Sequence, residues 1–96
     1  PQISLVIPCY NESEGIAAMR ERMRAALPAL HGRGPVELIL VDDGSSDGTG
    51  DMLVAAFGDW PGARVVRHER NRGLGQALRT GFSQASGAVV VTCDSD

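Results

Sequence analysis

Four short apolar runs alternate with longer segments in which apolar residues recur at helical spacing. Each run is five or six residues long and rich in apolar residues, which is typical of strands buried on both faces of a sheet. The expected strands cover Ile3 to Ile7, Val36 to Val41, Ala63 to His68 and Ala88 to Cys93. Pro8 closes the first run and a polar loop follows it.

The segments between these runs predict three helices. Ser13 and Glu14 can open the first helix, and Gly32 to Pro35 ends it. Asp51 to Phe57 forms a short second helix, and Gly87 ends the third. The core-facing positions expected on the first helix are Ile16, Met19, Met23, Ala26, Leu27 and Leu30, and those on the third are Leu74, Ala77, Leu78, Gly81, Phe82 and Ala85. We expect Gly81 to permit close packing.

Strands that alternate with helices and are apolar throughout predict an α/β fold with a mainly parallel sheet and right-handed crossovers. Polar residues follow the carboxyl end of every expected strand. In open parallel sheets this edge is where ligands bind. The side chains that the pattern sends there are Glu12, Asp42, Asp43, Asn71, Asp94 and Asp96.

Composition supports one ordinary globular domain, or part of one. Of 96 residues, 43% are hydrophobic and 22% are charged, and all nine basic residues are Arg, with a net charge of −3. No basic stripe argues for nucleic acid. The longest apolar runs have strand length, so neither a transmembrane span nor a signal peptide is expected. Cys9 and Cys93 lack metal-type spacing and are interpreted as small residues of a reducing compartment.

Asp94-Ser95-Asp96 is the sharpest chemical feature of the sequence. In an extended segment, residues two apart face the same way at about 6.6 Å, so both carboxylates can face one site. Mg²⁺ and Mn²⁺ prefer such oxygen ligands and often share them with substrate phosphates. The tripeptide alone is more often a solvated acidic turn. Its place after the fourth strand favours metal and diphosphate binding.

Asp42 and Asp43 directly follow the second strand. Their carboxylates can accept hydrogen bonds from a nucleobase or a ribose, or can cap the loop backbone. The sequence favours binding for Asp43 and leaves Asp42 open. Asp47 or Thr49 is expected to act as a cap.

Three further features are weaker. Tyr10, in Pro8-Cys9-Tyr10-Asn11-Glu12, can stack on a base or pack against the protein. The run from Asn71 to Gly75 brings backbone N–H groups to a helix N-terminus, which favours an anion such as diphosphate. His31 and His68 have no evident partner and are interpreted as structural. The three nearby arginines are open between phosphate contact and a solvated loop, and they are Arg67, Arg70 and Arg72.

Together, the segments from Val6 to Glu12, Val41 to Thr49, Asn71 to Gly75 and Asp94 to Asp96 closely resemble the family 2 glycosyltransferases. Within that family the chain looks most similar to the polyprenol-phosphate, dolichol-phosphate mannose synthase-like branch. The resemblance covers essentially the whole chain. It implies the GT-A fold, a three-layer α/β/α arrangement, here cut after the fourth strand.

The resemblance also implies an inverting transfer from a UDP- or GDP-sugar to an acceptor such as a polyprenyl phosphate or a growing glycan. The divalent cofactor would be Mg²⁺ or Mn²⁺, held by Asp94 and Asp96. By the same similarity, the nucleotide sugar would be bound by Pro8, Tyr10, Glu12, Val41, Asp43, Asp94 and Ser95. A catalytic base cannot be named from this sequence.

Residues 1 to 96 are interpreted as the N-terminal, donor-binding part of a longer domain, inactive by itself and with an uncovered sheet edge. The full-length protein would be cytoplasmic, at the membrane face if the acceptor is a lipid phosphate. Three alternatives remain at this point. They are a non-catalytic nucleotide-binding module, a phosphorylation receiver domain, which relies on a lysine that this chain lacks, and a nucleotidyltransferase, whose basic loop is replaced by Tyr10-Asn11-Glu12.

Overall fold

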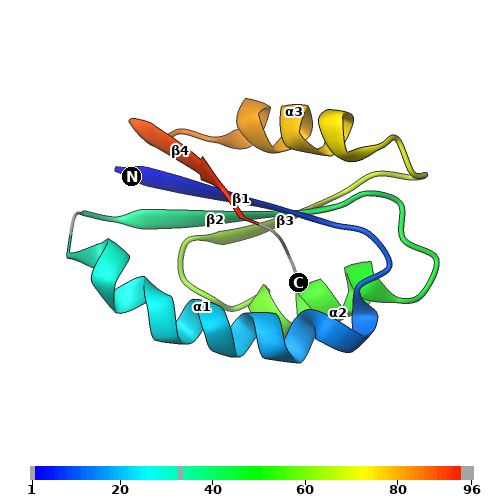
Figure 1. Ribbon diagram of the computed structural model, residues 1–96, viewed down its shortest axis with the longest axis horizontal. Coiled ribbons are helices and arrows are strands. Elements are labelled where there is room, and N and C mark those ends of the chain that lie inside the picture. The colour runs from blue at the N-terminus through cyan, green and yellow to red at the C-terminus, as the bar shows by residue number, and fades with distance from the viewer. Residues whose placement is uncertain (1, 33, 94–96) are drawn as a thin grey trace.

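The computed structural model describes residues 2–32 and 34–93. Strands and helices alternate along the chain, as the apolar pattern predicts (Figure 1). The elements in order are β1 (Ile3–Cys9), a 3₁₀ turn η1 (Ser13–Gly15), α1 (Ile16–His31), β2 (Val36–Asp42), α2 (Thr49–Phe57), β3 (Ala63–Arg67), α3 (Leu74–Gln84) and β4 (Val89–Thr92). None of the helices in the described part of the chain is long and apolar enough to cross a membrane.

The four strands form one parallel sheet in the order β3-β2-β1-β4. The N-terminal strand β1 is therefore central and has β2 and β4 as its two neighbours. Ile3 is in register with Val36 of β2 and with Val89 of β4. Because all the strands run the same way, their carboxyl ends meet at one edge of the sheet, as the sequence predicts.

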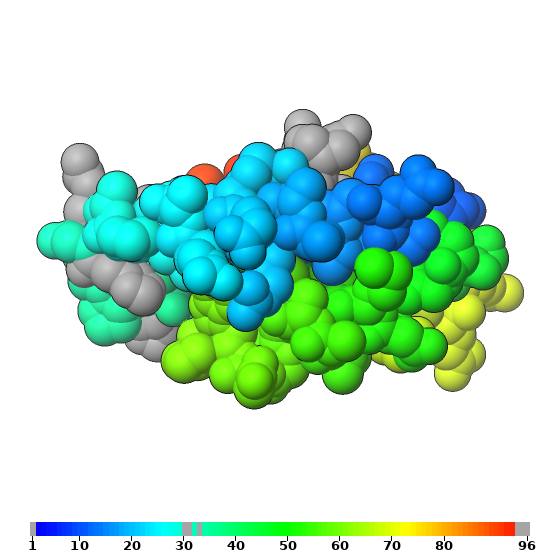
Figure 2. Space-filling view, turned by 90° about the horizontal axis from the view of Figure 1, so that it is seen from below, coloured from blue at the N-terminus to red at the C-terminus, as the bar shows by residue number. Residues whose placement is uncertain are grey.

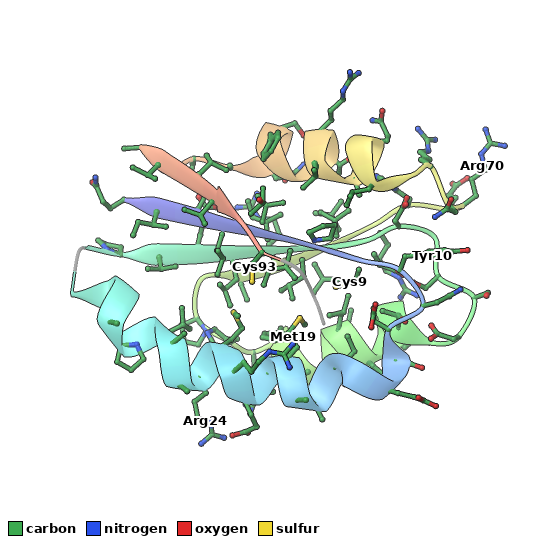
Figure 3. All side chains as sticks on the ribbon, in the orientation of Figure 1. Cys9, Tyr10, Met19, Arg24, Arg70 and Cys93 are labelled. Atoms are coloured by element: carbon green, nitrogen blue, oxygen red, sulfur yellow. The ribbon has the colours of Figure 1, made fainter. Side chains whose placement is uncertain are left out.

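Helices cover both faces of the sheet, which confirms the three-layer α/β/α prediction (Figure 1). Alternate residues of β1 and β2 face opposite layers, because side-chain direction alternates along a strand. Leu5 and Ile7 pack against the α1 and α2 side, on which Met19 lies between α1 and the sheet (Figure 3). Val6 packs against α3. The surface formed by α1 and α2 makes up most of the face seen in Figure 2.

Three parts of the predicted core are wrong. Ala26 faces solvent on α1, while its neighbour Leu27 is buried. Leu74 and Phe82 of α3 are 63% and 47% exposed, since the helix meets the sheet mainly through Ala77 and Gly81. All four residues of β4 are exposed because this strand lies at an edge of the four-stranded sheet, so it is not buried on both faces.

A buried carboxylate ties β1, β2 and the segment after α3 together near the amino ends of the strands. Glu37 accepts hydrogen bonds from Ser4 Oγ at 2.8 Å, Ser86 Oγ at 2.6 Å and Ser86 N at 2.9 Å. Burial raises the pKa of Glu37, but the hydrogen bonds from Ser86 and Ser4, with the charge of Arg64, outweigh it and leave the pKa below the ordinary value. The sequence pattern gave no sign of this network.

Candidate functional site

The described part of the hydrogen-bonded ladder between β1 and β4 reaches to just before the carboxyl edge of the sheet. Its last bond runs from Cys93 N to Val6 O at 3.0 Å. In a parallel ladder the next donor on β1 would be residue 8, and Pro8 has no N–H. Within residues 2–32 and 34–93, no further hydrogen bond of this ladder joins the two strands. A hollow of about 330 Å³ lies here, lined by Pro8, Leu74, Leu78, Thr92 and Cys93.

A second cavity, of about 190 Å³, shares Pro8 and Leu74 with the first. Its other lining residues are Cys9, Tyr10, Asp43, Asn71 and Ala77. Complete small-molecule sites usually measure about 300–1,000 Å³. The two adjoining cavities therefore have the size of one extended site when taken together. Tyr10 is 48% exposed and lies at this end of the molecule with Arg70 (Figure 3), so its ring is open to a ligand.

The Asp43 carboxylate is buried at the floor of this site, with 3% of the residue exposed. Oδ1 accepts hydrogen bonds from His68 Nδ1 at 2.8 Å and from the Arg72 backbone N–H at 2.9 Å. Oδ2 accepts from Asn71 Nδ2 and from the Gly73 backbone N–H, both at 3.0 Å. A carboxylate offers about four lone-pair positions, so protein donors occupy all of them.

This arrangement accounts for two of the backbone N–H groups in the segment from Asn71 to Gly75. Those of Arg72 and Gly73 donate to the protein's own Asp43 carboxylate. The positive end of α3 stabilises this negative charge. The loop after β3 is thereby fixed against the end of β2. Diphosphate binding by the other N–H groups of the segment stays a prediction.

His68 is a site residue that the sequence analysis missed. Its ring is 9% exposed and contacts Asp43 through Nδ1, and Nε2 lies 2.8 Å from Thr80 Oγ1 on α3. These partners are 25 and 12 residues away along the chain. The one available signal was the position of His68 at the end of a predicted strand, on the ligand-binding edge.

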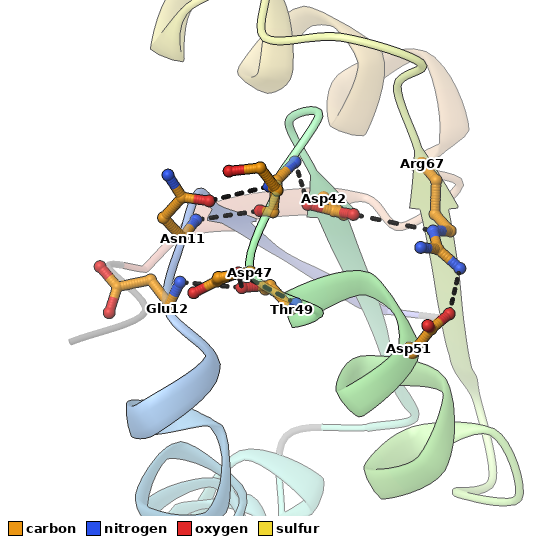
Figure 4. A network of polar contacts seen from close by, with 9 residues as sticks. Asn11, Glu12, Asp42, Asp47, Thr49, Asp51 and Arg67 are labelled. Atoms are coloured by element: carbon orange, nitrogen blue, oxygen red, sulfur yellow. Dashed lines mark hydrogen bonds and ion pairs between the residues drawn. The ribbon is translucent and has the colours of Figure 1, made fainter.

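The loops after β1 and β2 are joined by a network of polar contacts (Figure 4). Asn11 donates its N–H to Ser45 Oγ at 2.9 Å and accepts from Ser46 N at 3.0 Å. Glu12 donates its N–H to Thr49 Oγ1 at 2.9 Å. In Figure 4 the Glu12 carboxylate points away from Thr49.

Asp47 accepts the first backbone N–H of α2, although the N-cap position itself is Gly48 and not Asp47 or Thr49 as predicted. It accepts hydrogen bonds from the Thr49 N–H at 3.1 Å and from the Thr49 hydroxyl, and it also accepts from Ser13 N at 3.1 Å. The Thr49 hydroxyl is the largest cause of a fall in the pKa of Asp47 to about 2. The same carboxylate therefore joins the start of α2 to the turn that precedes α1.

Asp42, which the sequence left open, has a structural role in the described part of the chain. It accepts from Ser45 N at 3.1 Å, and its Oδ2 lies 3.7 Å from Arg67 Nε (Figure 4). Arg67 also pairs with Asp51 Oδ1 on α2 at 2.9 Å. Arg67 therefore bridges two carboxylates, whereas Arg70 and Arg72 are exposed on the loop that follows.

The structure brings together only part of the predicted set. Pro8, Tyr10 and Asp43 line one cavity, whereas Glu12 and Val41 are not among its lining residues. The Val41 side chain is fully buried on the α3 side of the sheet, so only its backbone could meet a ligand.

The predicted metal ligands Asp94 and Asp96, and Ser95 between them, lie outside the described residues. Within residues 2–32 and 34–93, no group of three His, Cys, Asp or Glu side chains could hold a metal ion. The described part of β4 runs parallel to β1 and ends at Thr92. The sequence that continues from it carries two carboxylates, and oxygen donors of this kind suit a hard divalent cation.

Comparison with known proteins gives a consistent result. The family model described as glycosyl transferase family 2 matches residues 4–96. The undecaprenyl-phosphate 4-deoxy-4-formamido-L-arabinose transferase of Serratia proteamaculans is 48% identical over 97 aligned residues, which cover 99% of this chain. The corresponding transferase of Yersinia enterocolitica is 42% identical. The chain spans 29% of the length of these relatives.

Solved structures show the same architecture. The mannosyltransferase PcManGT from Pyrobaculum calidifontis, in complex with GDP-Man and Mn²⁺, superposes with a TM-score of 0.85 at 28% identity. It matches 100% of this chain and 28% of its own. S. aureus TarS 1–349 in complex with UDP superposes with a TM-score of 0.74 at 27% identity, with the same coverage of both chains.

Proposed function

Because this chain belongs to glycosyl transferase family 2, we propose that the full-length protein is a glycosyltransferase that uses a UDP- or GDP-sugar and a divalent metal. The chain would supply the donor-binding part of its GT-A domain. The family match removes the receiver and nucleotidyltransferase alternatives. A non-catalytic member of the family remains as the alternative that experiment must exclude.

One observation carries the donor proposal. An aromatic ring and a buried carboxylate, those of Tyr10 and Asp43, line the same cavity at the ligand-binding edge of the sheet. A half-exposed ring can stack on a nucleobase, and a carboxylate can accept a base N–H. The similar proteins PcManGT and TarS, whose structures contain GDP-Man and UDP, support this assignment.

The Asp43 carboxylate can accept a hydrogen bond from a base N–H only if one of its four present donors is displaced. Three of them have little freedom, because they are two backbone N–H groups and the nearly buried His68 ring. Asn71 is exposed, and its amide belongs to a side chain that can turn away. We expect the base to take the place of the Asn71 amide on Oδ2.

For the metal, we propose Mg²⁺ or Mn²⁺ held by Asp94 and Asp96, with the Ser95 backbone beside the donor. When bound, the metal would offset the charge that develops on the nucleoside-diphosphate leaving group. The residues described here bind and orient the nucleoside. Glu12 and the Val41 backbone stay in the proposed donor site on the strength of the family resemblance.

The acceptor proposal is a polyprenyl phosphate, with transfer by inversion at the anomeric carbon. The similar proteins from Serratia and Yersinia are named as undecaprenyl-phosphate transferases, which favours a lipid phosphate over a growing glycan. A lipid-phosphate acceptor would place the full-length protein at the cytoplasmic face of a membrane.

The test is a calorimetric titration of UDP and GDP into the full-length protein, with and without Mn²⁺, beside an Asp94→Ala/Asp96→Ala variant. Metal-dependent binding of one nucleotide that the variant loses would support the proposal and identify the base. Binding without transfer of labelled sugar to undecaprenyl phosphate, or to a glycan, would favour the non-catalytic module. Failure to bind either nucleotide would overturn the donor assignment.

A further inference from the structure

The His68 ring is held at both of its nitrogens by groups from different parts of the fold. Nδ1 lies 2.8 Å from Asp43 Oδ1, at the end of β2, and Nε2 lies 2.8 Å from Thr80 Oγ1, on α3. The His68 backbone N–H also donates to Asp42 O at 2.9 Å. Backbone and ring together therefore fix this residue between the sheet and the helix.

The partners determine which nitrogen carries the proton. The carboxylate of Asp43, which takes three further N–H donors, acts only as an acceptor, so His68 Nδ1 must be the donor in that contact. A neutral ring then presents a lone pair at Nε2, which the Thr80 hydroxyl can satisfy as a donor. Asp43 thereby selects the tautomer of the ring, and Thr80 helps to fix its orientation.

We infer that His68 is a positioning residue for the donor site, a role that rests on the function proposed above. It would hold the Asp43 carboxylate in the orientation in which Oδ2 faces the cavity. Without the ring, Oδ1 would keep one of its two donors, the Arg72 N–H. The carboxylate could then rotate, and the loop of residues 71–73, which donates hydrogen bonds to it, would no longer be held in place.

The placement of the contacts argues for this role over simple filling of space. The ring meets Asp43 on the oxygen that also holds the Arg72 N–H, while the other oxygen holds the exposed Asn71 amide and the Gly73 N–H. The His68 ring and the exchangeable Asn71 amide therefore lie on different oxygens of Asp43. A base that displaces Asn71 from Oδ2 leaves the His68 contact intact, so the site remains ordered while the ligand binds.

Two substitutions separate the two ring contacts. In His68→Asn, the side-chain amide lies near the position of Nδ1 and can still donate to Asp43. In His68→Gln, the amide reaches toward Nε2 and keeps the Thr80 contact instead. Each variant is made in the full-length protein, and UDP and GDP affinity is measured by calorimetry with Mn²⁺. His68→Ala removes both contacts, and Glu37→Gln, which disturbs the hydrogen bonds near the amino ends of the strands, is the control for lost stability.

The nucleotide affinity of His68→Asn should lie within about threefold of that of the unaltered protein. The affinities of His68→Gln and His68→Ala should be roughly 10- to 100-fold lower, which is the change expected when a hydrogen bond to a charged group is lost. The loss should appear in the KM for the donor more than in kcat. Equal affinity in all three His68 variants would overturn the inference, and so would a loss of affinity no greater than that of Glu37→Gln.

A measurement on the unaltered protein covers the case in which the variants do not fold. The proton on His68 Nδ1 should give a downfield NMR signal that persists and shifts when nucleotide saturates the site. A signal that nucleotide leaves unchanged would count against the positioning role. If the unaltered protein bound neither UDP nor GDP, the donor proposal would fail first, and this inference would fail with it.

Discussion

Gly44 lies against the backbone of Arg70, so that a β-carbon on Gly44 would be 2.0 Å from the Arg70 carbonyl carbon. Gly44 also has a φ of 70°, which L side chains rarely adopt. The loop that follows β2 and the loop that follows β3 can therefore touch only if residue 44 has no side chain. This contact allows Asp43 to reach the N–H groups of residues 72 and 73.

We expect Gly44→Ala to lower the free energy of unfolding by roughly 2–4 kcal/mol, because backbone strain and the clash with Arg70 add. Urea unfolding of the full-length protein measures this. Gly48→Ala is the matched control, since Gly48 has a φ of 86° but nothing lies within 4 Å of a β-carbon there. The control should lose only about 1–2 kcal/mol, and equal losses would contradict the clash argument.

The contact between α3 and β1 gives a second prediction. A β-carbon on Gly81 would lie 2.2 Å from Val6 Cγ1, whereas one on Gly75 of the same helix would meet nothing within 4 Å. Gly81→Ala should therefore destabilise the fold by about 1–3 kcal/mol. Gly75→Ala should be neutral or stabilise the helix by up to about 1 kcal/mol. Thermal unfolding of the two variants checks the difference, and a stable Gly81→Ala would show that α3 can move away.

Glu37 predicts a dependence of stability on pH. Because its pKa in the folded protein lies below the ordinary 4.5, its ionised form stabilises the fold above that pH, and this contribution is lost as the pH falls through the lowered pKa. Glu37→Gln should cost about 1–2 kcal/mol near pH 7 and progressively less in acid. Denaturant titrations from pH 7 to pH 3 measure this. Glu14→Gln, at an exposed position, is the control. Its free energy of unfolding should lie within about 0.5 kcal/mol of that of the unaltered protein at pH 7.

Tyr10 offers a test of base stacking that leaves the fold alone, because its side chain is about half exposed. Tyr10→Ala should weaken nucleotide binding by about 1–3 kcal/mol, the usual value of one base–aromatic contact, whereas Tyr10→Phe should keep most of the affinity. Calorimetry with the preferred nucleotide separates the two variants. Equal weakening would point to the hydroxyl group rather than the ring as the contact.

The fold could be predicted because its signals are local. Four apolar runs and three helical patterns determine an α/β order, and the edge to which Asp43 belongs follows from the direction of the strands. The glycine at position 81 was also expected to allow close packing, and Val6 does approach it. The family was recognised from motifs that span the chain, and the family match confirms it.

The polar contacts of the site could not be predicted because they join loops distant in sequence. Asp43 meets His68 across 25 residues, and Asn11 meets Ser45 across 34. No local sequence pattern indicates which loop donates hydrogen bonds to which carboxylate. For the same reason the sequence could not tell that Asp43 accepts hydrogen bonds from the Arg72 and Gly73 N–H groups just before α3. Exposure of the β4 valines was missed because edge and central strands have the same apolar composition.

The strand order β3-β2-β1-β4 also determines when each strand can find its partners during synthesis. β1 is made first, yet its second neighbour is completed only at Thr92, about 50 residues after β2 ends at Asp42. At roughly 5–20 residues per second, one side of β1 waits on the order of 3–10 seconds for β4 to emerge from the ribosome. During synthesis the strand that later forms the centre of the sheet is thus an open edge, with unpaired N–H and C=O groups that another chain could pair with.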